Sequence, residues 1–330
     1  MKGKKSGLTR RAFLKSAAAL SAAPCIIPAT ALGGEGRAAP SERIVMGGIG
    51  IGGRGTYDLR QLIAWSEVQF VADSDPRAER RANVKKLVDA HYNNEDCKLY
   101  IDFREMLARE DIDAVLIATG DRWHAMASIL AMRAGKDVFC EKPCSISIAE
   151  ARALADTERR YGRVYQAGTQ RRSEENFVFV MELARTGRLG KLHTLTAHIV
   201  HGLSQHKWFP PEPEPPRDEF DWDLYLGPAP WRPYSRAYLQ WHWHYDMHGG
   251  GLPEWGSHTF DMCQWANGAD NTGPVEFEYP NNDTAEGLVA QYANGVKLVC
   301  KGGPAFPGSC GVRFTGSEGW AECSDGQPAT

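Results

Sequence analysis

Residues 43–55 read RIVMGGIGIGGRG, an apolar run that leads directly into a cluster of glycines. The run suits a β-strand, and the glycines match the pattern G-x-G-x-x-G, with Gly50, Gly52 and Gly55 at its fixed positions. A second register begins at Gly48, but the later one leaves a longer strand before the turn. Such glycines let the backbone turn tightly and approach a pyrophosphate at a helix N-terminus. The stretch therefore predicts a dinucleotide-binding strand, turn and helix.

An acidic residue stands at the end of the second predicted strand. Residues 68–72 form the strand, and Asp73 follows 23 positions after Gly50. This is near the spacing expected for the acid that binds the ribose hydroxyls of adenosine. A carboxylate accepts both hydroxyls but repels a 2′-phosphate, so we predict NAD rather than NADP as the cofactor. Arg77, close by, is the one feature that would favour NADP.

Strands and helices alternate through the first half of the chain. The expected strands cover residues 43–49, 68–72, 98–101, 113–118, 137–140 and 164–167. Residues 113–118 read DAVLIA, an apolar run suited to a strand buried on both faces. Strands separated by helices predict an α/β fold with a doubly wound parallel sheet, which we place at residues 40–170.

The pattern changes in residues 171–330. Residues 191–200 alternate with period two, as in a sheet with one solvated face. Further strands are expected at residues 275–278, 288–292, 296–300 and 311–314, with one helix at residues 253–266. This part of the chain therefore predicts an α+β domain.

The first 39 residues read as a targeting segment. They hold seven Lys or Arg residues and a single acid, and Arg10 and Arg11 precede an alanine-rich run. Residues 9–15, TRRAFLK, resemble the twin-arginine export motif. The alternative is a basic amphipathic first helix. The run falls short of the about 20 apolar residues that span a membrane, so we expect no stable membrane insertion. We expect the twin-arginine machinery to deliver the protein to the periplasm or another exported location.

Charge and cysteine content limit the partners. The formal net charge is −3 although the targeting segment is basic, so the remainder of the chain is acidic. An acidic chain without a basic stripe argues against nucleic acid as a partner. Beyond Cys25 there are seven cysteines, an odd number without the spacing of a zinc site, and we expect buried free thiols.

A lysine follows the fifth predicted strand. The sequence Glu141-Lys142-Pro143 comes directly after residues 137–140. Ligands of open parallel sheets bind beyond the carboxyl ends of the strands, where Lys142 would stand. A lysine beside a nicotinamide and an alcohol can hold or donate a proton. The alternative is a surface lysine in a turn.

A second cluster combines carboxylates with an imidazole. Residues 249–261 read GGGLPEWGSHTFD, in which three glycines and a proline lead into a helix. Glu254 and His258 are four residues apart and share a helical face, and Asp261 is placed on that face as well. This combination suits abstraction of a proton from a hydroxyl. The alternative is a hydrogen-bond network at the start of the helix.

Together these motifs resemble the Gfo/Idh/MocA oxidoreductases. The resemblance runs from about residue 43 to residue 321, and it includes ATGDRWH at residues 118–124. Residues 167–173 (AGTQRRS) and 222–230 (WDLYLGPAP) resemble the exported branch of that family. The family implies a Rossmann domain followed by a domain on an open mixed sheet. It also implies substrates such as sugars, inositols or glycosides, and we expect a homo-oligomer.

The resemblance assigns roles to individual residues. Lys142 is implied to contact the reacting hydroxyl, His258 to be the catalytic acid/base, and Glu254 to stand where the family usually has Asp. The expected cofactor-binding residues are Gly50, Gly52, Gly53, Arg54, Gly55, Asp73, Thr119, Trp123, His124, Glu141 and Lys142. Trp123 and His124 are placed at the nicotinamide end. The expected substrate contacts are Gln170, Arg171 and Asp261. Family members usually continue well past residue 312, which implies a shortened C-terminal domain.

A metal site is the alternative use of a histidine cluster. Residues 241–248 read WHWHYDMH, and His242 and His244 would face the same side of a strand, with His198 and His201 upstream. The resemblance implies no metal, and we expect none.

Two other functions remain open beside sugar oxidation. Some relatives use the cofactor transiently to oxidise a glycoside, eliminate the aglycone and reduce the product, with no net redox change. The second alternative is a non-catalytic protein that binds cofactor or sugar. The presence of Lys142 and His258 argues against it. An exported enzyme finds little free NAD, so we expect a tightly held cofactor.

Overall fold

The computed structural model describes residues 33, 38–199, 208–240, 244–280, 287–302 and 305–330. The chain divides into two units, residues 1–43 and residues 44–330. The described part of the first unit contains a short 3-10 helix, η2 (Pro40–Glu42). The predicted export motif, with Arg10 and Arg11, lies outside the described residues. The second unit contains two six-stranded sheets.

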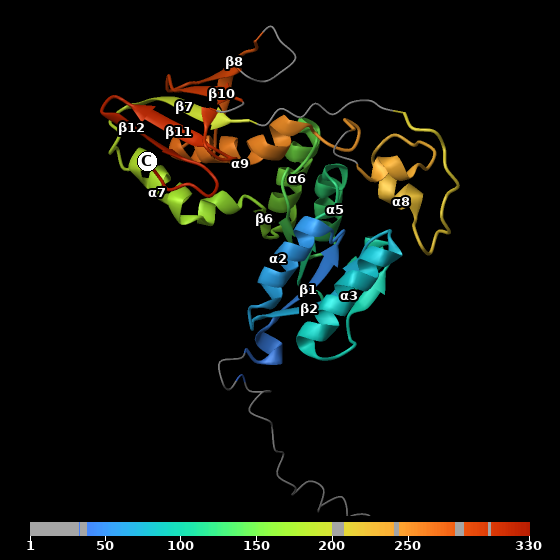
Figure 1. The fold of residues 1–330 in the computed structure, drawn as a ribbon. Coiled ribbons are helices and arrows are strands. Elements are labelled where there is room, and N and C mark those ends of the chain that lie inside the picture. The colour runs from blue at the N-terminus through green and yellow to red at the C-terminus, as the bar shows by residue number, and fades with distance from the viewer. Residues whose placement is uncertain (1–32, 34–37, 200–207, 241–243, 281–286, 303–304) are drawn as a thin grey trace, which may run out of the picture. The chain divides into compact units, whose positions relative to one another are not determined.

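The first sheet is parallel throughout, with the strand order β3-β2-β1-β4-β5-β6. Its strands are β1 (Ile44–Ile49), β2 (Val68–Ser74), β3 (Lys98–Tyr100), β4 (Ala114–Ile117), β5 (Asp137–Cys140) and β6 (Tyr165–Ala167). The connecting helices are α2 (Gly53–Ile63), α3 (Ala78–Tyr92), α4 (Phe103–Leu107), α5 (Asp121–Arg133) and α6 (Ile148–Tyr161). The chain winds from β1 outward to β3 and from β4 outward to β6, which confirms the predicted doubly wound sheet (Figure 1). Ligands of such sheets bind where the direction reverses, beyond β1 and β4.

Helices cover both faces of the first sheet. On one face, Leu59 of α2 and Val84 of α3 belong to the same buried cluster as Phe70 of β2. On the other face, Ala127 of α5 belongs to a cluster with Val138 of β5. Because β4 lies between these two layers, its sequence is almost continuously apolar, and this made the strand predictable.

The second sheet is mixed, with the order β12-β11-β7-β10-β9-β8. Its strands are β7 (Leu192–His198), β8 (Pro274–Glu278), β9 (Val289–Tyr292), β10 (Lys297–Lys301), β11 (Val312–Gly316) and β12 (Gly319–Cys323). Strands β7 and β10 pair in parallel, whereas the other neighbours are antiparallel. The predicted mixed sheet is confirmed, and β12 is an additional strand.

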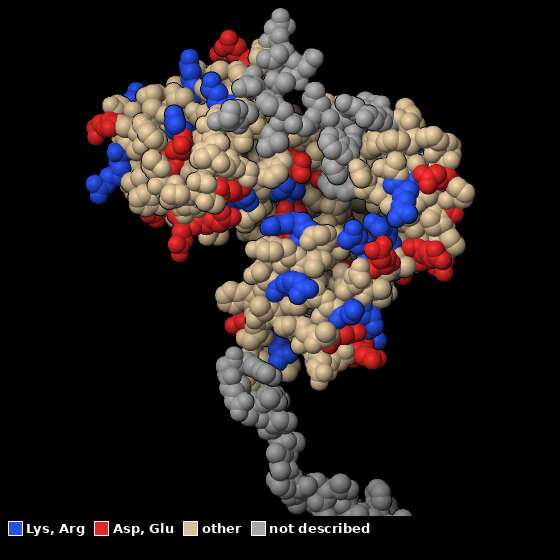
Figure 2. Space-filling view, in the orientation of Figure 1, with Lys and Arg blue, Asp and Glu red and all other residues tan. Residues whose placement is uncertain are grey.

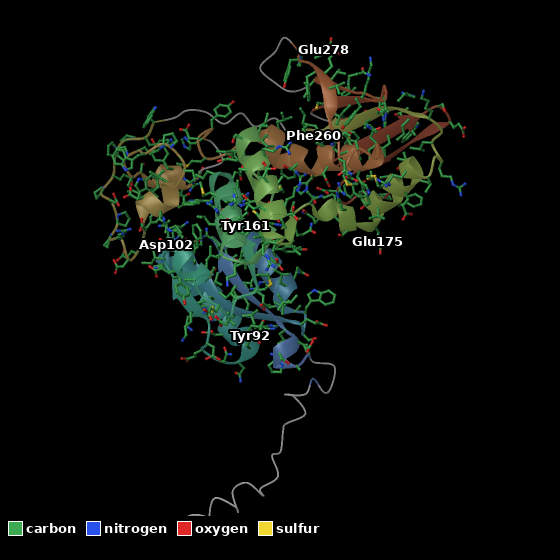
Figure 3. The ribbon with its side chains drawn as sticks, turned by 180° about the vertical axis from the view of Figure 1, so that it is seen from behind. Tyr92, Asp102, Tyr161, Glu175, Phe260 and Glu278 are labelled. Carbon is green, nitrogen blue, oxygen red and sulfur yellow. The ribbon has the colours of Figure 1, made fainter. Side chains whose placement is uncertain are left out.

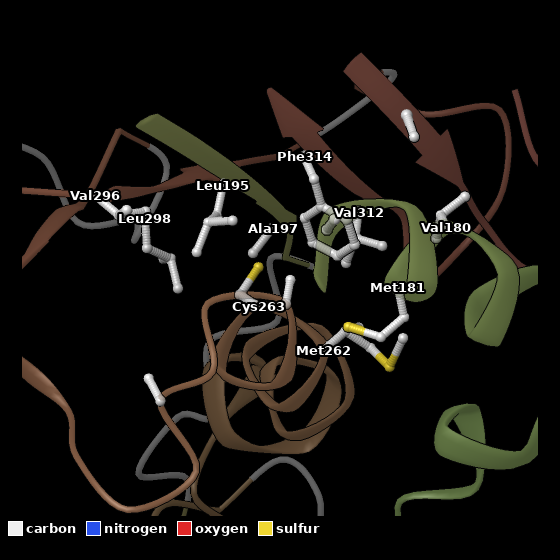
Figure 4. Close-up of a cluster of buried hydrophobic side chains, with 14 of the residues drawn as sticks. Val180, Met181, Leu195, Ala197, Met262, Cys263, Val296, Leu298, Val312 and Phe314 are labelled. Atoms are coloured by element: carbon white, nitrogen blue, oxygen red, sulfur yellow. The ribbon is translucent and has the colours of Figure 1, made fainter. Parts of the chain in front are cut away.

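Two helices, α7 (Glu175–Arg185) and α9 (Gly251–Ala266), lie along one face of the second sheet (Figure 1). Figure 4 shows Met181 of α7 and Met262 of α9 among the buried side chains of Leu195 and Phe314. Burial of a side chain of this size contributes about 1.5–3 kcal/mol. The packing fixes α9, which carries Glu254 and His258 in its first half.

A third, smaller core lies outside both sheets. It surrounds α8 (Trp222–Leu226) and the 3-10 helix η4 (Arg236–Leu239), and its buried members include Phe220, Trp222 and Tyr238. Another 3-10 helix, η3 (Gln170–Ser173), leads from β6 toward α7.

The surface charge, the helix lengths and the cysteines of the described residues can each be compared with what the sequence predicts. On the face drawn in Figure 2, the described acidic and basic side chains are interspersed. Across the described ranges, no helix has the length and apolar character needed to cross a membrane. The seven described cysteines are free, and all of them except the partly buried Cys144 are buried, as predicted.

Candidate active site

The glycine turn after β1 has the shape that a pyrophosphate requires. Gly50 has a φ of +69°, and an added Cβ would lie 2.4 Å from Cγ2 of Thr119. A Cβ on Gly52 would meet nothing within 4 Å, so the backbone is open to a ligand there. A Cβ on Gly55 would lie 2.7 Å from the Cβ of Ala118, because α2 packs closely on β4. A tight turn, an open backbone and close helix packing are the three roles of glycine in such sites, so these residues fit NAD.

A cleft of about 250 Å³ opens beside this turn, and we name it the dinucleotide cleft. The glycine turn, the end of β2 and the start of α5 form its walls. Gly53 and Arg54, the first residues of α2, line it together with Thr119. The N-terminus of α2 therefore presents unpaired N–H groups and a positive dipole end to a pyrophosphate.

The acid that faces the dinucleotide cleft is Asp75, whereas the sequence pattern indicated Asp73. Asp73 is fully buried, and burial raises the pKa of its carboxyl well above the ordinary value. A Cβ on Gly48 would lie 2.7 Å from Oδ1 of Asp73, so this side chain faces β1. Asp75 lines the cleft, and its Oδ1 accepts a hydrogen bond of 2.8 Å from the Arg77 N–H. Burial raises the pKa of Asp75 to about 6, so the group is ionised at neutral pH and can accept ribose hydroxyls.

The difference between the two acids follows from where β2 ends. The sequence pattern ended the strand at Ala72, because Asp73 and Ser74 are polar. In the structure both residues still pair with β1, and the strand ends at Ser74. The first residue beyond the strand, at the ligand-binding edge, is therefore Asp75.

Trp123 and His124, adjacent residues of α5, face different clefts. Trp123 lines the dinucleotide cleft with Asp75, and its indole N–H donates to the carbonyl of Leu224 at 3.0 Å. Trp123 is therefore a residue of the dinucleotide cleft, and its position at the nicotinamide end stays a prediction. His124 does not line that cleft, and its Nδ1 lies 2.6 Å from the carbonyl oxygen of Pro143. His124 thereby connects α5 to the loop that carries Lys142.

A second cleft, of about 320 Å³, brings the predicted catalytic residues together, and we name it the catalytic cleft. Lys142 comes from the loop after β5, and Glu254 and His258 come from α9. The cleft is also lined by Thr119, His124, Glu141, Gln170 and Arg171, all predicted to bind cofactor or substrate. Arg54 and Thr119 line both clefts, so the two adjoin. A dinucleotide in the first cleft can therefore reach a substrate in the second.

Lys142 is held in place by Glu141, Arg54 and Trp255. One oxygen of Glu141 accepts from Nε of Arg54 at 2.9 Å, and the other accepts from the backbone N–H of Lys142 at 3.1 Å. The Nζ of Lys142 lies 5.7 Å from the centroid of the Trp255 ring, a cation–π contact. The backbone of Lys142 is thus tied to the first turn of α2, while its ammonium group lies over α9.

His258 is a neutral imidazole in the catalytic cleft. Its side chain is 3% exposed, and burial lowers its pKa from 6.5 to about 3. The positive charges of Arg171 and Lys142 lower the pKa further. A neutral imidazole keeps a lone pair, so His258 can accept a proton from a hydroxyl.

His248 positions Glu254, a role that no sequence motif indicated. The backbone N–H of Gly250 donates to Nδ1 of His248 at 3.1 Å, so the ring N–H lies on Nε2. Nε2 lies 3.2 Å from Oε2 of Glu254 and 3.6 Å from Oδ2 of Asp121. One oxygen of Glu254 is thereby anchored while the side chain lines the catalytic cleft. The proximity of His248 to the three glycines was the available signal.

Two of the three predicted substrate residues line the catalytic cleft. Gln170 and Arg171 do so, and the guanidinium of Arg171 donates to both carboxylate oxygens of Asp325. Asp261 does not line it: its oxygens accept from Arg172 at 2.7 Å each, beside a neighbouring cavity that Lys142 also lines. Asp261 therefore lies outside the catalytic cleft, where Arg172 engages its carboxylate, and its contact with a substrate stays a prediction.

The histidine cluster gives no metal site in the described residues. His244 is buried against the rings of Phe209 and Tyr238. Within the described ranges, no group of three or more His, Cys, Asp or Glu side chains is arranged to hold a metal ion. His201 and His242 lie outside the described residues.

The fold and the clefts define a dinucleotide-binding oxidoreductase, and comparison with known proteins identifies its family. Residues 43–169 match the model described as "Oxidoreductase family, NAD-binding Rossmann fold". Residues 201–305 match the model described as "Oxidoreductase family, C-terminal alpha/beta domain". Together the two matches cover more than half of the chain. The chain belongs to the Gfo/Idh/MocA family of NAD-binding oxidoreductases.

Individual relatives are distant in sequence. The chain is 27% identical over 295 residues to the rhizopine catabolism protein MocA of Rhizobium meliloti, covering 85% of this chain and 78% of that protein. It is 29% identical over 150 residues to a myo-inositol 2-dehydrogenase of Thermotoga maritima, covering 46% and 43%. It is 29% identical over 216 residues to glycosyl hydrolase family 109 protein 1 of Shewanella sp. MR-4, covering 59% and 46%.

A solved structure shares the fold. The crystal structure of GenD2 from gentamicin A biosynthesis, in complex with NAD, has a TM-score of 0.64 and 20% sequence identity. The match covers 87% of this chain and 74% of GenD2. At this identity the likeness supports the two-domain fold.

Proposed function

We propose that this enzyme oxidises a hydroxyl of a sugar, inositol or glycoside. One observation carries the proposal: Lys142, His258 and Glu254 converge in a catalytic cleft that adjoins the dinucleotide cleft. NAD, when bound, supplies a hydride acceptor for the carbon that bears the hydroxyl. The relatives support the substrate class, because they include an inositol dehydrogenase and a glycosyl hydrolase.

The residues of the catalytic cleft divide the proton chemistry. The ammonium of Lys142 donates a hydrogen bond to the reacting oxygen and stabilises the negative charge that develops there. His258, neutral in the folded protein, accepts the hydroxyl proton as the carbon loses its hydride. Glu254, held by His248, accepts a hydrogen bond from a second substrate hydroxyl and so orients the ring.

The direct test is spectroscopic. Candidate sugars and polyols are added to the protein with NAD bound, and absorbance of the reduced nicotinamide is followed. Reduction by at least one compound supports the proposal, with His258→Asn slowing it. No reduction by any sugar, inositol or glycoside would refute it.

Redox-neutral glycoside cleavage is the second candidate. It is favoured by the similarity to a glycosyl hydrolase family 109 protein. In that reaction the carbon oxidised first is reduced again after the aglycone has left, so no reduced cofactor accumulates. Aryl glycosides separate the two candidates: aglycone release without net cofactor reduction indicates cleavage.

We further propose that the protein is exported by the twin-arginine route to the periplasm. The support is the sequence TRRAFLK at residues 9–15. That route carries folded proteins, so the dinucleotide can leave already bound. Replacement of Arg10 and Arg11 by Lys should retain the protein in the cytoplasm, as fractionation would show. Unchanged export of the variant would exclude this route.

A further inference from the structure

The second part of the chain returns to cover one end of the dinucleotide cleft. We define the cap as residues 216–239, which include α8, η4 and most of the third core. Leu224, Tyr225 and Leu239 of the cap line the dinucleotide cleft together with Asp75. In Rossmann sites the acid after β2 marks the adenosine ribose, so the cap lies at the adenosine end.

One side of the cap is fastened to the end of β2 and the start of α3. The backbone N–H of Ala78 donates to the carbonyl of Glu219 at 2.9 Å, and the N–H of Asp221 donates to that of Pro76 at 3.1 Å. The buried guanidinium of Arg81 joins the two segments, since it donates to the carbonyls of Asp75 at 2.6 Å and Asp218 at 2.9 Å.

A second turn of the Rossmann domain, the one that follows β3, lies near the same side of the cap. Asp102, labelled in Figure 3, lies before α4. Its pKa is lowered mainly by the hydrogen bond from Arg104, and the positive charge of Arg217 in the cap adds to this effect. The charge of the cap therefore also acts on the turn before α4.

The other side of the cap is fastened to α5. Nε of Arg122, a side chain that is 2% exposed, donates to the carbonyl of Leu226 at 3.0 Å, and its guanidinium lies 4.6 Å from the Tyr225 ring centroid. The indole of Trp123 donates to Leu224 at 3.0 Å. Gly227 has a φ of +55°, and a Cβ there would lie 2.2 Å from the Trp123 ring. The cap thus rests directly on α5.

The cap is also internally rigid. The Trp222 side chain is 1% exposed, its ring stacks on that of Tyr225 with centroids 5.4 Å apart, and its indole donates to the Arg232 carbonyl at 2.8 Å. A rigid segment anchored on both sides of a cleft hinders passage in both directions.

We propose that the cap encloses the adenosine half of the dinucleotide and makes its release slow. Three residues of the cap, Leu224, Tyr225 and Leu239, supply part of the wall of the cleft, so the cofactor stays bound through many turnovers. The inference rests on dinucleotide binding by this cleft and deepens the proposed function. It assigns cofactor retention to residues far from those that act on the substrate.

Two variants loosen the cap without replacing a residue that lines the cleft, and Gly227→Ala is the decisive one, because the charge of Arg81 also acts on Asp75. Arg81→Met removes both hydrogen bonds of the guanidinium. Gly227→Ala forces the cap away from Trp123. Matched controls lie in the second domain: Arg185→Met removes a hydrogen bond to the Trp265 carbonyl, and Gly187→Ala places a Cβ at a φ of +76° in open space.

The readout is the rate of dinucleotide exchange, measured by displacing fluorescent NADH with excess NAD. Loss of one or two anchoring hydrogen bonds should speed release by about tenfold or more. Association should accelerate as well, because a cap obstructs entry and exit alike. The controls should change neither rate. The proposal would be overturned if hydrogen exchange shows that residues 216–239 are loosened in both cap variants while their rates of dinucleotide release are unchanged. No sugar is present, so failure of the proposed sugar chemistry would not affect the result.

Discussion

The buried imidazole of His258 makes a quantitative prediction about stability at acid pH. In the folded protein its pKa is lowered from 6.5 to about 3, mainly by burial and further by Arg171 and Lys142. Between these two values the unfolded chain binds a proton at His258 that the folded chain does not. The free energy of unfolding therefore falls as the pH drops through this window, and the full contribution of His258 is present above pH 6.5.

The magnitude follows from the shift. Each pKa unit corresponds to about 1.4 kcal/mol, so by pH 5 protonation of the unfolded chain should cost the wild type about 2 kcal/mol relative to pH 8. His258→Asn removes this loss. The buried acids Asp58 and Asp75, with pKa values raised to about 7 and about 6, act in the opposite direction but are present in both proteins.

The assay is urea unfolding of the wild type and His258→Asn at pH 8 and pH 5. The difference in unfolding free energy between the two proteins should shift by about 2 kcal/mol in favour of the variant at pH 5. The control is His193→Asn, because His193 is exposed and its imidazole is solvated in both states. A pH-independent difference for His258→Asn would mean that the folded imidazole keeps a pKa near 6.5, which would contradict the lowering of its pKa by burial.

Three further predictions concern the two clefts. Lys142→Met should lower turnover by about 10²–10⁴-fold, because the reacting oxygen loses the hydrogen bond and the positive charge that stabilise it. The affinity for NAD, measured by titration, should stay near that of the wild type. Asp75→Ala should weaken NAD binding about tenfold and change NADP binding little. Asp73→Asn should leave the ratio of the NAD and NADP affinities as it was. The opposite pattern would restore Asp73 as the acid that binds the ribose. Glu254→Gln should lower kcat/KM for the sugar by about 10-fold or more, through loss of a charged hydrogen bond, and unaltered kinetics would remove Glu254 from the substrate site.

The parts of the molecule that were predictable from sequence are those in which a local pattern has one structural meaning. Strand β4 is buried on both faces, so its residues are apolar without interruption. Gly50, Gly52 and Gly55 have separate steric reasons to lack a Cβ or to leave the backbone open, and their spacing made the turn recognisable. Lys142 and His258 were found because each belongs to a longer motif.

The remainder depends on contacts between distant segments. Asp73 and Asp75 differ by two positions, and only the pairing of β2 with β1 decides which lies beyond the strand. Asp261 looked available on its helix, but Arg172, 89 positions earlier, binds its carboxylate. The cap is held by bonds such as that of Arg81 to Asp218, across 137 positions, for which no local sequence signal exists.

The central claim is that this protein oxidises a carbohydrate hydroxyl with a dinucleotide that it retains. The most direct measurement is mass spectrometry of the products formed from a panel of sugars, inositols and glycosides by protein purified without added cofactor. The expected result is a product that has lost two hydrogen atoms, at up to one equivalent per bound dinucleotide, and at higher yield when a second sugar is supplied as hydride acceptor. Recovery of every compound unchanged by protein that contains stoichiometric dinucleotide would contradict the claim and indicate a binding protein.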